Sequence, residues 1–140
     1  MGNVEMFEHT ADVGLRVRGA DLDDLFTTAA EGLFDFIVAN RHVVRCDDWE
    51  LISLATDSLE QLFLAWLSEL IFRCETRHRL YNGFKIQIAQ DGLSLEAEIG
   101  GEPIDSNRHE LDHEIKAVTQ HGFVLMKDAD GWVAEVILDI

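Results

Sequence analysis

Apolar residues recur at intervals of three and four in two long stretches of the chain. The stripe in residues 21–38 consists of Leu22, Leu25, Phe26, Ala29, Ala30, Leu33, Phe34 and Ile37. The stripe that follows Asp57-Ser58 consists of Leu59, Leu62, Phe63, Trp66, Leu67, Leu70, Ile71 and Cys74. This spacing places the apolar side chains on one face, so the pattern predicts two amphipathic helices. Asp21 and Ser58 are the predicted N-caps, and Ser58 and Gln61 have the spacing of a capping box.

Apolar and polar residues alternate in most of the remaining chain, and this alternation predicts β-strands. In the first such segment Val13, Leu15 and Val17 alternate with Gly14, Arg16 and Arg18. Further strands are predicted at residues 49–55, 84–89, 93–99, 115–119, 123–126 and 132–138, with a short extended piece at 42–46. Turns are predicted at Asp47-Asp48, Asn82-Gly83, Asp91-Gly92 and Asp130-Gly131, and a loop at 100–105.

A strand-helix unit occurs twice in the first half of the chain. Residues 22–26 (LDDLF) resemble residues 59–63 (LEQLF) at an offset of 37, and at the same offset Leu15 and Val17 fall on Ile52 and Leu54. Two copies are too few for a solenoid. The pattern predicts one α+β domain, residues 1–140, with two layers: two helices packed on a mainly antiparallel sheet.

The charge of the chain makes direct binding to nucleic acid unfavourable. It has 27 acidic and 11 basic residues and a formal net charge of −16. Nucleic-acid binding depends on Lys and Arg that neutralise phosphates, so we expect any role in RNA chemistry to operate through a protein partner. No apolar run is long enough to span a membrane, and we expect no membrane partner. Cys46 and Cys74 are predicted to be packing residues of a reduced, cytoplasmic protein.

Residues 109–113 read His-Glu-Leu-Asp-His, which has the spacing of the H-E-x-x-H zinc-protease motif. That chemistry requires both histidines on one face of a stable helix, together with a third ligand. The segment is polar and short and leads into a strand-like run. We therefore interpret it as a polar loop or a single helical turn.

Three motifs together resemble the signature of the archease family. They are residues 7–14 (FEHTADVG), residues 114–122 (EIKAVTQHG) and the C-terminal residues 136–140 (VILDI), in the order found in that family. The resemblance runs nearly from end to end, although Gln120 stands where the family has an aromatic residue. It implies a protein cofactor of a GTP-dependent RtcB-type tRNA-splicing RNA ligase, chaperone-like and not itself an enzyme, which promotes guanylylation and repeated turnover of the ligase.

The resemblance also implies a metal site. Asp12 and Asp139 match the metal-site positions of the family, and the terminal carboxylate of Ile140 lies one residue further on. Oxygen ligands of this kind favour a divalent cation, with Ca²⁺ preferred and Mg²⁺ the other choice. His9 is expected to orient the turn or to act as a ligand.

Two further residues are candidates for a supporting role or for contact with a partner. Glu69, on the second predicted helix, is an additional acidic candidate. Lys116, in the second motif, is expected to pair with carboxylates or to contact a partner.

Two other classes of function remain open. One is a metal-dependent hydrolase that uses Asp12, Asp139 and His9, which needs a substrate pocket and a metal-bound water. The other is an acidic interaction module or chaperone without a metal. A hydrolase acts alone, a ligase activator is inert alone, and an acidic module works equally well after chelation.

Overall fold

In the computed structural model, which describes residues 2–9 and 12–140, seven strands, two α-helices and one 3₁₀ turn follow one another along the chain. Their bounds are β1 (Asn3–His9), β2 (Asp12–Gly19), α1 (Leu22–Ile37), η1 (Arg41–Val43), β3 (Asp48–Ala55), α2 (Leu59–Arg77), β4 (Arg79–Ile88), β5 (Ser94–Pro103), β6 (Ala117–Asp128) and β7 (Gly131–Asp139). The predicted α+β class is confirmed.

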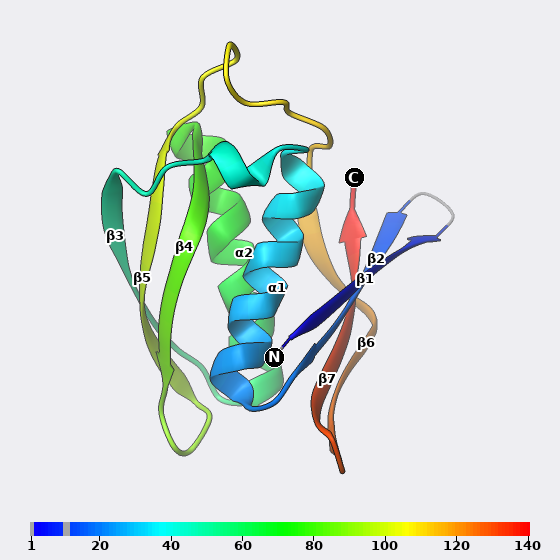
Figure 1. The fold of residues 1–140 in the computed structure, drawn as a ribbon. Helices are drawn as coiled ribbons and strands as arrows, with labels where there is room; N and C mark the ends of the chain where they lie inside the picture. The colour runs from blue at the N-terminus through cyan, green and yellow to red at the C-terminus, as the bar shows by residue number, and fades with distance from the viewer. Residues whose placement is uncertain (1, 10–11) are drawn as a thin grey trace.

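The strands of the described residues form two antiparallel sheets, in place of the single sheet that the pattern predicts. One sheet has the order β1-β2-β7-β6 and the other the order β3-β5-β4. Both helices lie between the sheets (Figure 1). Helix α1 contacts β2 of one sheet and β4 of the other, and for this reason it is buried over most of its circumference.

The predicted repeat is visible in the chain order, because β2 leads into α1 and β3 leads into α2. Leu15 and Ile52, equivalent at the offset of 37, are both buried. The two strands nevertheless belong to different sheets, so the strands of the repeated units lie on opposite sides of the helices (Figure 1). A single sheet fails as a prediction because alternation shows only that a strand has one buried face, not which strands pair with it.

Both helices begin as predicted. The Asp21 side chain accepts a hydrogen bond from the Asp24 amide at 2.8 Å, and the Ser58 hydroxyl accepts one from the Gln61 amide at 3.1 Å. The Gln61 side chain accepts from the Asp57 amide at 3.2 Å, one residue before the partner that a capping box requires. These bonds satisfy backbone donors that have no partner within the helix.

Two predicted breaks in the second half of the chain are wrong, because glycines lie inside strands. Gly83 belongs to β4, at a bulge after Tyr81, and Gly100 belongs to β5. The two glycines are paired across the strands, and a Cβ atom on either would lie within 3 Å of the Trp49 indole. Glycine is therefore required at both positions because the Trp49 ring covers them, and not because the chain turns there.

Two other local predictions are also wrong. Residues 41–43 form the 3₁₀ turn η1 in place of an extended piece, because the Val43 and Val44 amides bond back to Asn40 and Arg41 at 3.0 Å. Residues 115–119 and 123–126 are predicted as two strands, but β6 is one strand from Ala117 to Asp128. Its register with β7 shifts between Thr119 and Val124.

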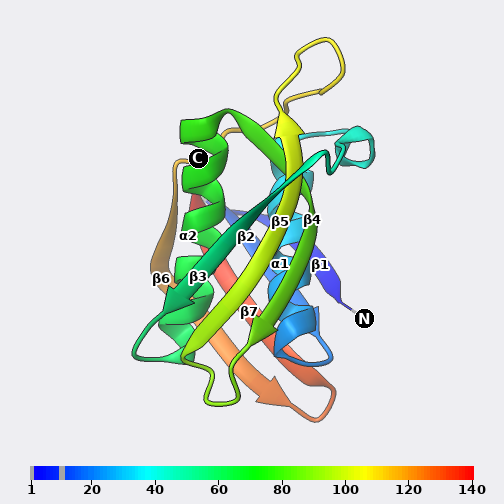
Figure 2. The same cartoon turned by 90° about the vertical axis from the view of Figure 1, so that its left-hand side faces the viewer.

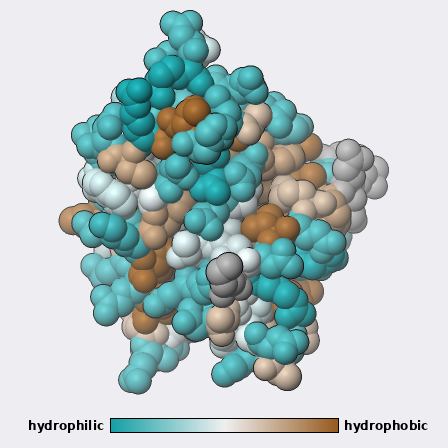
Figure 3. Space-filling model, viewed as in Figure 1, coloured by the Kyte–Doolittle hydropathy of each residue, from teal (hydrophilic) through white to brown (hydrophobic). Residues whose placement is uncertain are grey.

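The core lies between the sheets. Its largest buried side chains include Trp66, Phe26 and Phe63, and the Trp66 indole N–H donates to the Phe26 carbonyl at 3.0 Å. The surface is mainly hydrophilic on the face shown in Figure 3, with small apolar patches. In the part of the chain that the structure describes, neither helix is long and apolar enough to cross a membrane.

Candidate functional site

The register of the β2–β7 pair brings Asp12 and Asp139 together. The two strands are antiparallel, and Asp12 is the direct cross-strand partner of Asp139. Side chains that are directly opposite leave the same face of a sheet, with Cβ atoms about 5 Å apart. Two residues separated by 127 positions in the sequence thus become neighbours at one end of this sheet.

Alternation along the strands decides which face carries the pair. Val13 pairs with Leu138, and both are buried toward the helices. Asp12 and Asp139 therefore lie on the opposite face, directed away from the core. Asp139 is exposed and Asp12 is partly buried, so both carboxylates are accessible from outside the molecule.

The neighbouring positions on this outer face explain part of the first motif. Phe7, Gly14 and Ile137 are paired side by side across β1, β2 and β7. A Cβ atom on Gly14 would lie 1.9 Å from the Phe7 ring, so only glycine allows the ring to lie across β2 here. One pair further along, Arg16 bonds to Glu135 at 2.8 Å and to Glu5 at 2.6 Å.

In the described part of the chain, the aspartate pair has no comparable arginine partner. Among the described side chains, which do not include those of residues 8 and 9, no basic side chain forms an ion pair with Asp12 or Asp139. Ile140, the residue after Asp139, is 37% exposed. Like charges at such a separation repel each other unless a proton or a cation neutralises them.

These residues fit a hard divalent cation, although they do not complete its coordination. Among the side chains that the structure describes, no three from His, Cys, Asp and Glu come together as a metal site. Two aspartates supply fewer oxygens than the six to eight that Ca²⁺ takes. Water or another molecule would have to supply the remaining oxygens.

Two other residues of the motifs lie at the same end of the sheet. The backbone of His9 pairs with Asp12, but the His9 side chain, and residues 10 and 11, lie outside the described part of the structure. The Lys116 amide donates to the Asp139 carbonyl at 2.8 Å, while its side chain is exposed. The proposed roles of the His9 imidazole and the Lys116 ammonium stay predictions.

Glu69 belongs to a different cluster. Its carboxylate accepts from Arg73 at 2.7 Å, and Arg73 also bonds Glu50 of β3 at 2.9 Å. The Tyr81 hydroxyl donates to the same Glu50 at 2.8 Å. This network joins α2 to the β3-β5-β4 sheet. Glu69 is therefore explained as an ion-pair partner of Arg73.

The zinc-protease spacing at residues 109–113 lies in the loop between β5 and β6, as interpreted from the sequence. His109 is buried, whereas the His113 ring is exposed and stacks on Phe36 with centroids 4.2 Å apart. The Asp105 amide donates to His109 Nδ1 at 2.9 Å, so Nδ1 carries no proton. Nε2 lies 2.9 Å from a Glu102 oxygen and is then the donor to it. His109 thus anchors the loop and is not arranged as a metal ligand with His113.

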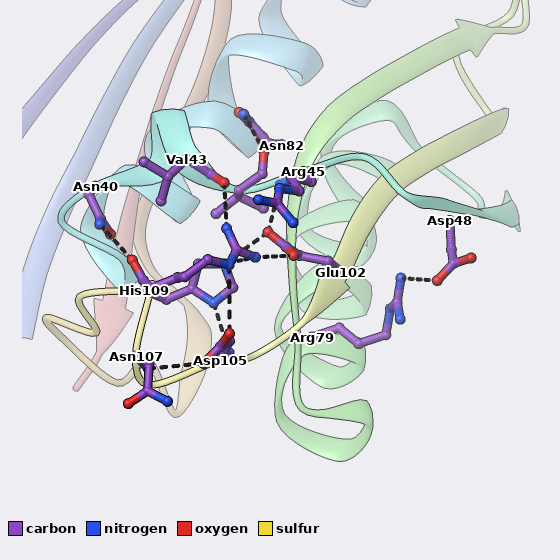
Figure 4. A network of polar contacts seen from close by, with 12 residues as sticks. Asn40, Val43, Arg45, Asp48, Arg79, Asn82, Glu102, Asp105, Asn107 and His109 are labelled. Atoms are coloured by element: carbon purple, nitrogen blue, oxygen red, sulfur yellow. Dashed lines mark hydrogen bonds and ion pairs between the residues drawn. The ribbon is translucent and has the colours of Figure 1, made fainter.

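Glu102 is the centre of this anchor, and the sequence contains no signal for it. Figure 4 shows its carboxylate beside Arg45 and His109. It accepts from the Arg45 amide at 2.7 Å and from the Arg108 guanidinium. Burial raises the pKa of Glu102, but the hydrogen bonds from Arg108, the Arg45 amide and His109 outweigh it and lower the pKa to about 2.

Comparison with known proteins gives one consistent result. The model of the archease protein family matches residues 4–140. The proteins called archease from Saccharolobus islandicus and Pyrococcus abyssi are 33% and 34% identical over 140 and 139 residues, covering 100% and 97% of this chain and the same shares of their own.

Solved structures agree with this. The solution structure of protein 1598 from Methanobacterium thermoautotrophicum superposes with a TM-score of 0.79 at 31% identity, covering 98% of both chains. A crystal structure from Thermotoga maritima, described as an archease and possible chaperone, has a TM-score of 0.69 at 19% identity and covers 97% of this chain and 96% of its own. At that identity the Thermotoga structure supports the fold alone. The family model and the curated relatives show that the chain belongs to the archease protein family.

Proposed function

We propose that the protein is a non-catalytic activator of a GTP-dependent RtcB-type RNA ligase in tRNA splicing or RNA repair. It would promote guanylylation of the ligase and allow repeated turnover. The resemblance to the archease motifs implies this role, and family membership supports the coarser conclusion that the chain acts on other macromolecules as an accessory protein.

The observation that carries the proposal is the juxtaposition of Asp12 and Asp139. Both residues lie at one end of a sheet, on the face directed away from the core. An accessible pair of carboxylates on adjacent strands is suited to bind a divalent cation and to present it to another molecule. The incomplete oxygen set leaves room for a ligand that comes from a partner.

Asp12, Asp139 and the Ile140 carboxylate would hold the ion, with Ca²⁺ preferred over Mg²⁺. The ion would supply positive charge toward the phosphates of a nucleotide bound by the ligase. The chain's own contribution is to place the carboxylates at a fixed spacing, set by the strand register, and to bring them to the partner.

The charge of the protein supports a protein partner over RNA. With a net charge of −16, the surface repels phosphates unless basic side chains gather locally. Two of the arginines on the outer face of the β1-β2-β7-β6 sheet, Arg16 and Arg18, form ion pairs within the protein. They are therefore already neutralised.

Ligation at limiting ligase tests the proposal. Product should stop near one equivalent of ligase without the protein and continue for many turnovers with it. Asp12→Asn and Asp139→Asn should each reduce the stimulation, whereas Glu98→Gln, which removes an exposed charge on the other sheet, should not. Stimulation that persists in full after chelation would favour a metal-free acidic module. Hydrolysis of a small substrate by the protein alone would favour a hydrolase.

A further inference from the structure

Two adjoining clefts form a groove along helix α2. The larger, of about 490 Å³, lies between the C-terminal ends of both helices and the loop of residues 104–116. The smaller, of about 270 Å³, lies between α2 and the start of β6. Both are lined by Ile71 and Glu75, so they continue into one another. This continuous feature is called the α2 groove below.

The groove combines an apolar floor with exposed apolar side chains. Ile37, Ile71 and Ile115 form part of the floor and are buried. Leu111 and Phe72 line the two clefts and are 55% and 58% exposed. Large apolar side chains exposed beside a concave surface are typical of a protein-binding site.

The larger cleft of the groove is also acidic. Glu75, Asp112 and Glu114 line the larger cleft. Asp112 lies 3.3 Å from His113, but in the described chain Glu75 and Glu114 form no ion pair. Two unpaired carboxylates beside apolar side chains complement a segment in which an apolar residue is flanked by Lys or Arg.

The wall formed by the loop is already in place before any partner arrives. The Ala39 amide donates to the Glu110 carbonyl at 2.7 Å, and the Asp112 amide donates to the Ile37 carbonyl at 2.8 Å. The buried Glu102–His109 contact holds the preceding part of the same loop. A preformed groove lowers the entropic cost of binding.

The groove extends to the candidate metal pair. Lys116 and Ala117 line its smaller cleft, and the Lys116 amide bonds to the Asp139 carbonyl. Figure 2 shows α2 and β6 on the same side of the molecule, and the two elements are in contact. A segment lying in the groove would therefore end close to Asp12 and Asp139.

We infer that the α2 groove is the docking site for a segment of the ligase that carries an apolar anchor residue flanked by Lys or Arg. This inference rests on the proposed function and adds to it the surface and the chemistry of recognition. A second copy of this chain is a poor occupant, because it too carries a net charge of −16.

Calorimetric binding of the full chain to the ligase tests the inference. Leu111→Ala, Glu75→Lys and Glu114→Lys should each weaken the affinity by about tenfold, because each removes an anchor contact or reverses a complementary charge. The matched controls lie on the other sheet, where Leu51 is 76% exposed and Glu98 is exposed. Leu51→Ala and Glu98→Lys should leave the affinity within about twofold of wild type. Far-UV circular dichroism verifies that every variant is folded.

A photo-crosslinking residue at position 111, compared with one at position 51, identifies the occupant. Crosslinking from position 111 to a ligase segment rich in Lys or Arg is expected, and crosslinking to a second copy of the chain would overturn the inference. If the groove variants bind the ligase as tightly as wild type, the groove is not the docking site although the proposed function stands. If the wild-type protein does not bind the ligase at all, both are overturned.

Discussion

Glu102→Gln is expected to destabilise the fold. The Glu102 carboxylate accepts hydrogen bonds from three donors, and these bonds hold the loop between β5 and β6 in place. One carboxylate oxygen accepts from the Arg45 amide at 2.7 Å and from His109 at 2.9 Å, and the other accepts from Arg108. Glutamine has the same shape but replaces one oxygen by an NH₂ group. In either amide orientation at least one of the donors then faces another donor.

The magnitude can be obtained in two ways. Loss of a hydrogen bond to a charged, buried group costs about 1.5–3 kcal/mol. Independently, the pKa of Glu102 falls from an ordinary 4.5 to about 2, which corresponds to roughly 3 kcal/mol at ~1.4 kcal/mol per pKa unit. The side chain is only 6% exposed, so solvent weakens these interactions little. The free energy of unfolding should therefore fall by about 2–3 kcal/mol.

The lowered pKa of Glu102 also determines how its contribution to stability changes with pH. Because the pKa of Glu102 is lower in the folded than in the unfolded protein, its ionised form stabilises the fold at any pH above about 4.5. This contribution is lost as the pH falls toward 2, where the folded protein also takes up the proton. The difference in stability between wild type and Glu102→Gln should thus be constant near neutral pH and shrink between about pH 4.5 and 2.

Urea unfolding followed by tryptophan fluorescence measures this difference, since Trp66 is buried in the core. Glu98→Gln is the matched control. Its carboxylate is exposed and should change the stability by less than about 0.5 kcal/mol. Equal midpoints for wild type and Glu102→Gln at neutral pH, or curves that stay parallel down to about pH 3, would refute the assigned role of Glu102.

Three further predictions concern the candidate metal site and its partners. Ca²⁺ should raise the melting temperature, by an amount equivalent to about 2.7 kcal/mol at a hundredfold excess over the dissociation constant, and Asp12→Ala should abolish the rise; an unchanged response would place the ion elsewhere. A short neutral C-terminal tag, which converts the Ile140 carboxylate to an amide, should weaken calcium binding with little change in circular dichroism, whereas an N-terminal tag should do much less; calorimetry showing equal affinities would exclude the chain terminus from the site. The protein alone should show no measurable affinity for tRNA at physiological salt, and a tight, salt-sensitive gel shift would contradict the adaptor role.

The helices and most strands follow from the sequence, because the signals for them are local. The spacing of apolar residues predicts both ends of α1 to within one residue and also the start of α2, and Asp21 and Ser58 cap the two helices as expected. The same local rules fail at Gly83 and Gly100. A glycine in a turn and a glycine beneath a tryptophan ring look alike in sequence, and only the position of Trp49 distinguishes them.

The candidate site shows a similar division. The first and last motifs single out Asp12 and Asp139 through a family resemblance, and the sequence places each at the end of a strand. That the two carboxylates face each other depends on β2 and β7 being neighbours in the sheet and on the register between them, since a shift of one residue would move one of them to the buried face.

Other features have no signal in the sequence at all. Glu102 and Arg108 read as ordinary polar residues of a loop, and His109 only as part of a zinc-protease spacing; their buried contact exists because the loop folds back over the end of α1. The α2 groove likewise requires both helices and that loop to be in place. Periodicity along the chain determines which face of each element is buried, whereas contacts between distant elements depend on how those faces pack together, and this is decided by the tertiary structure.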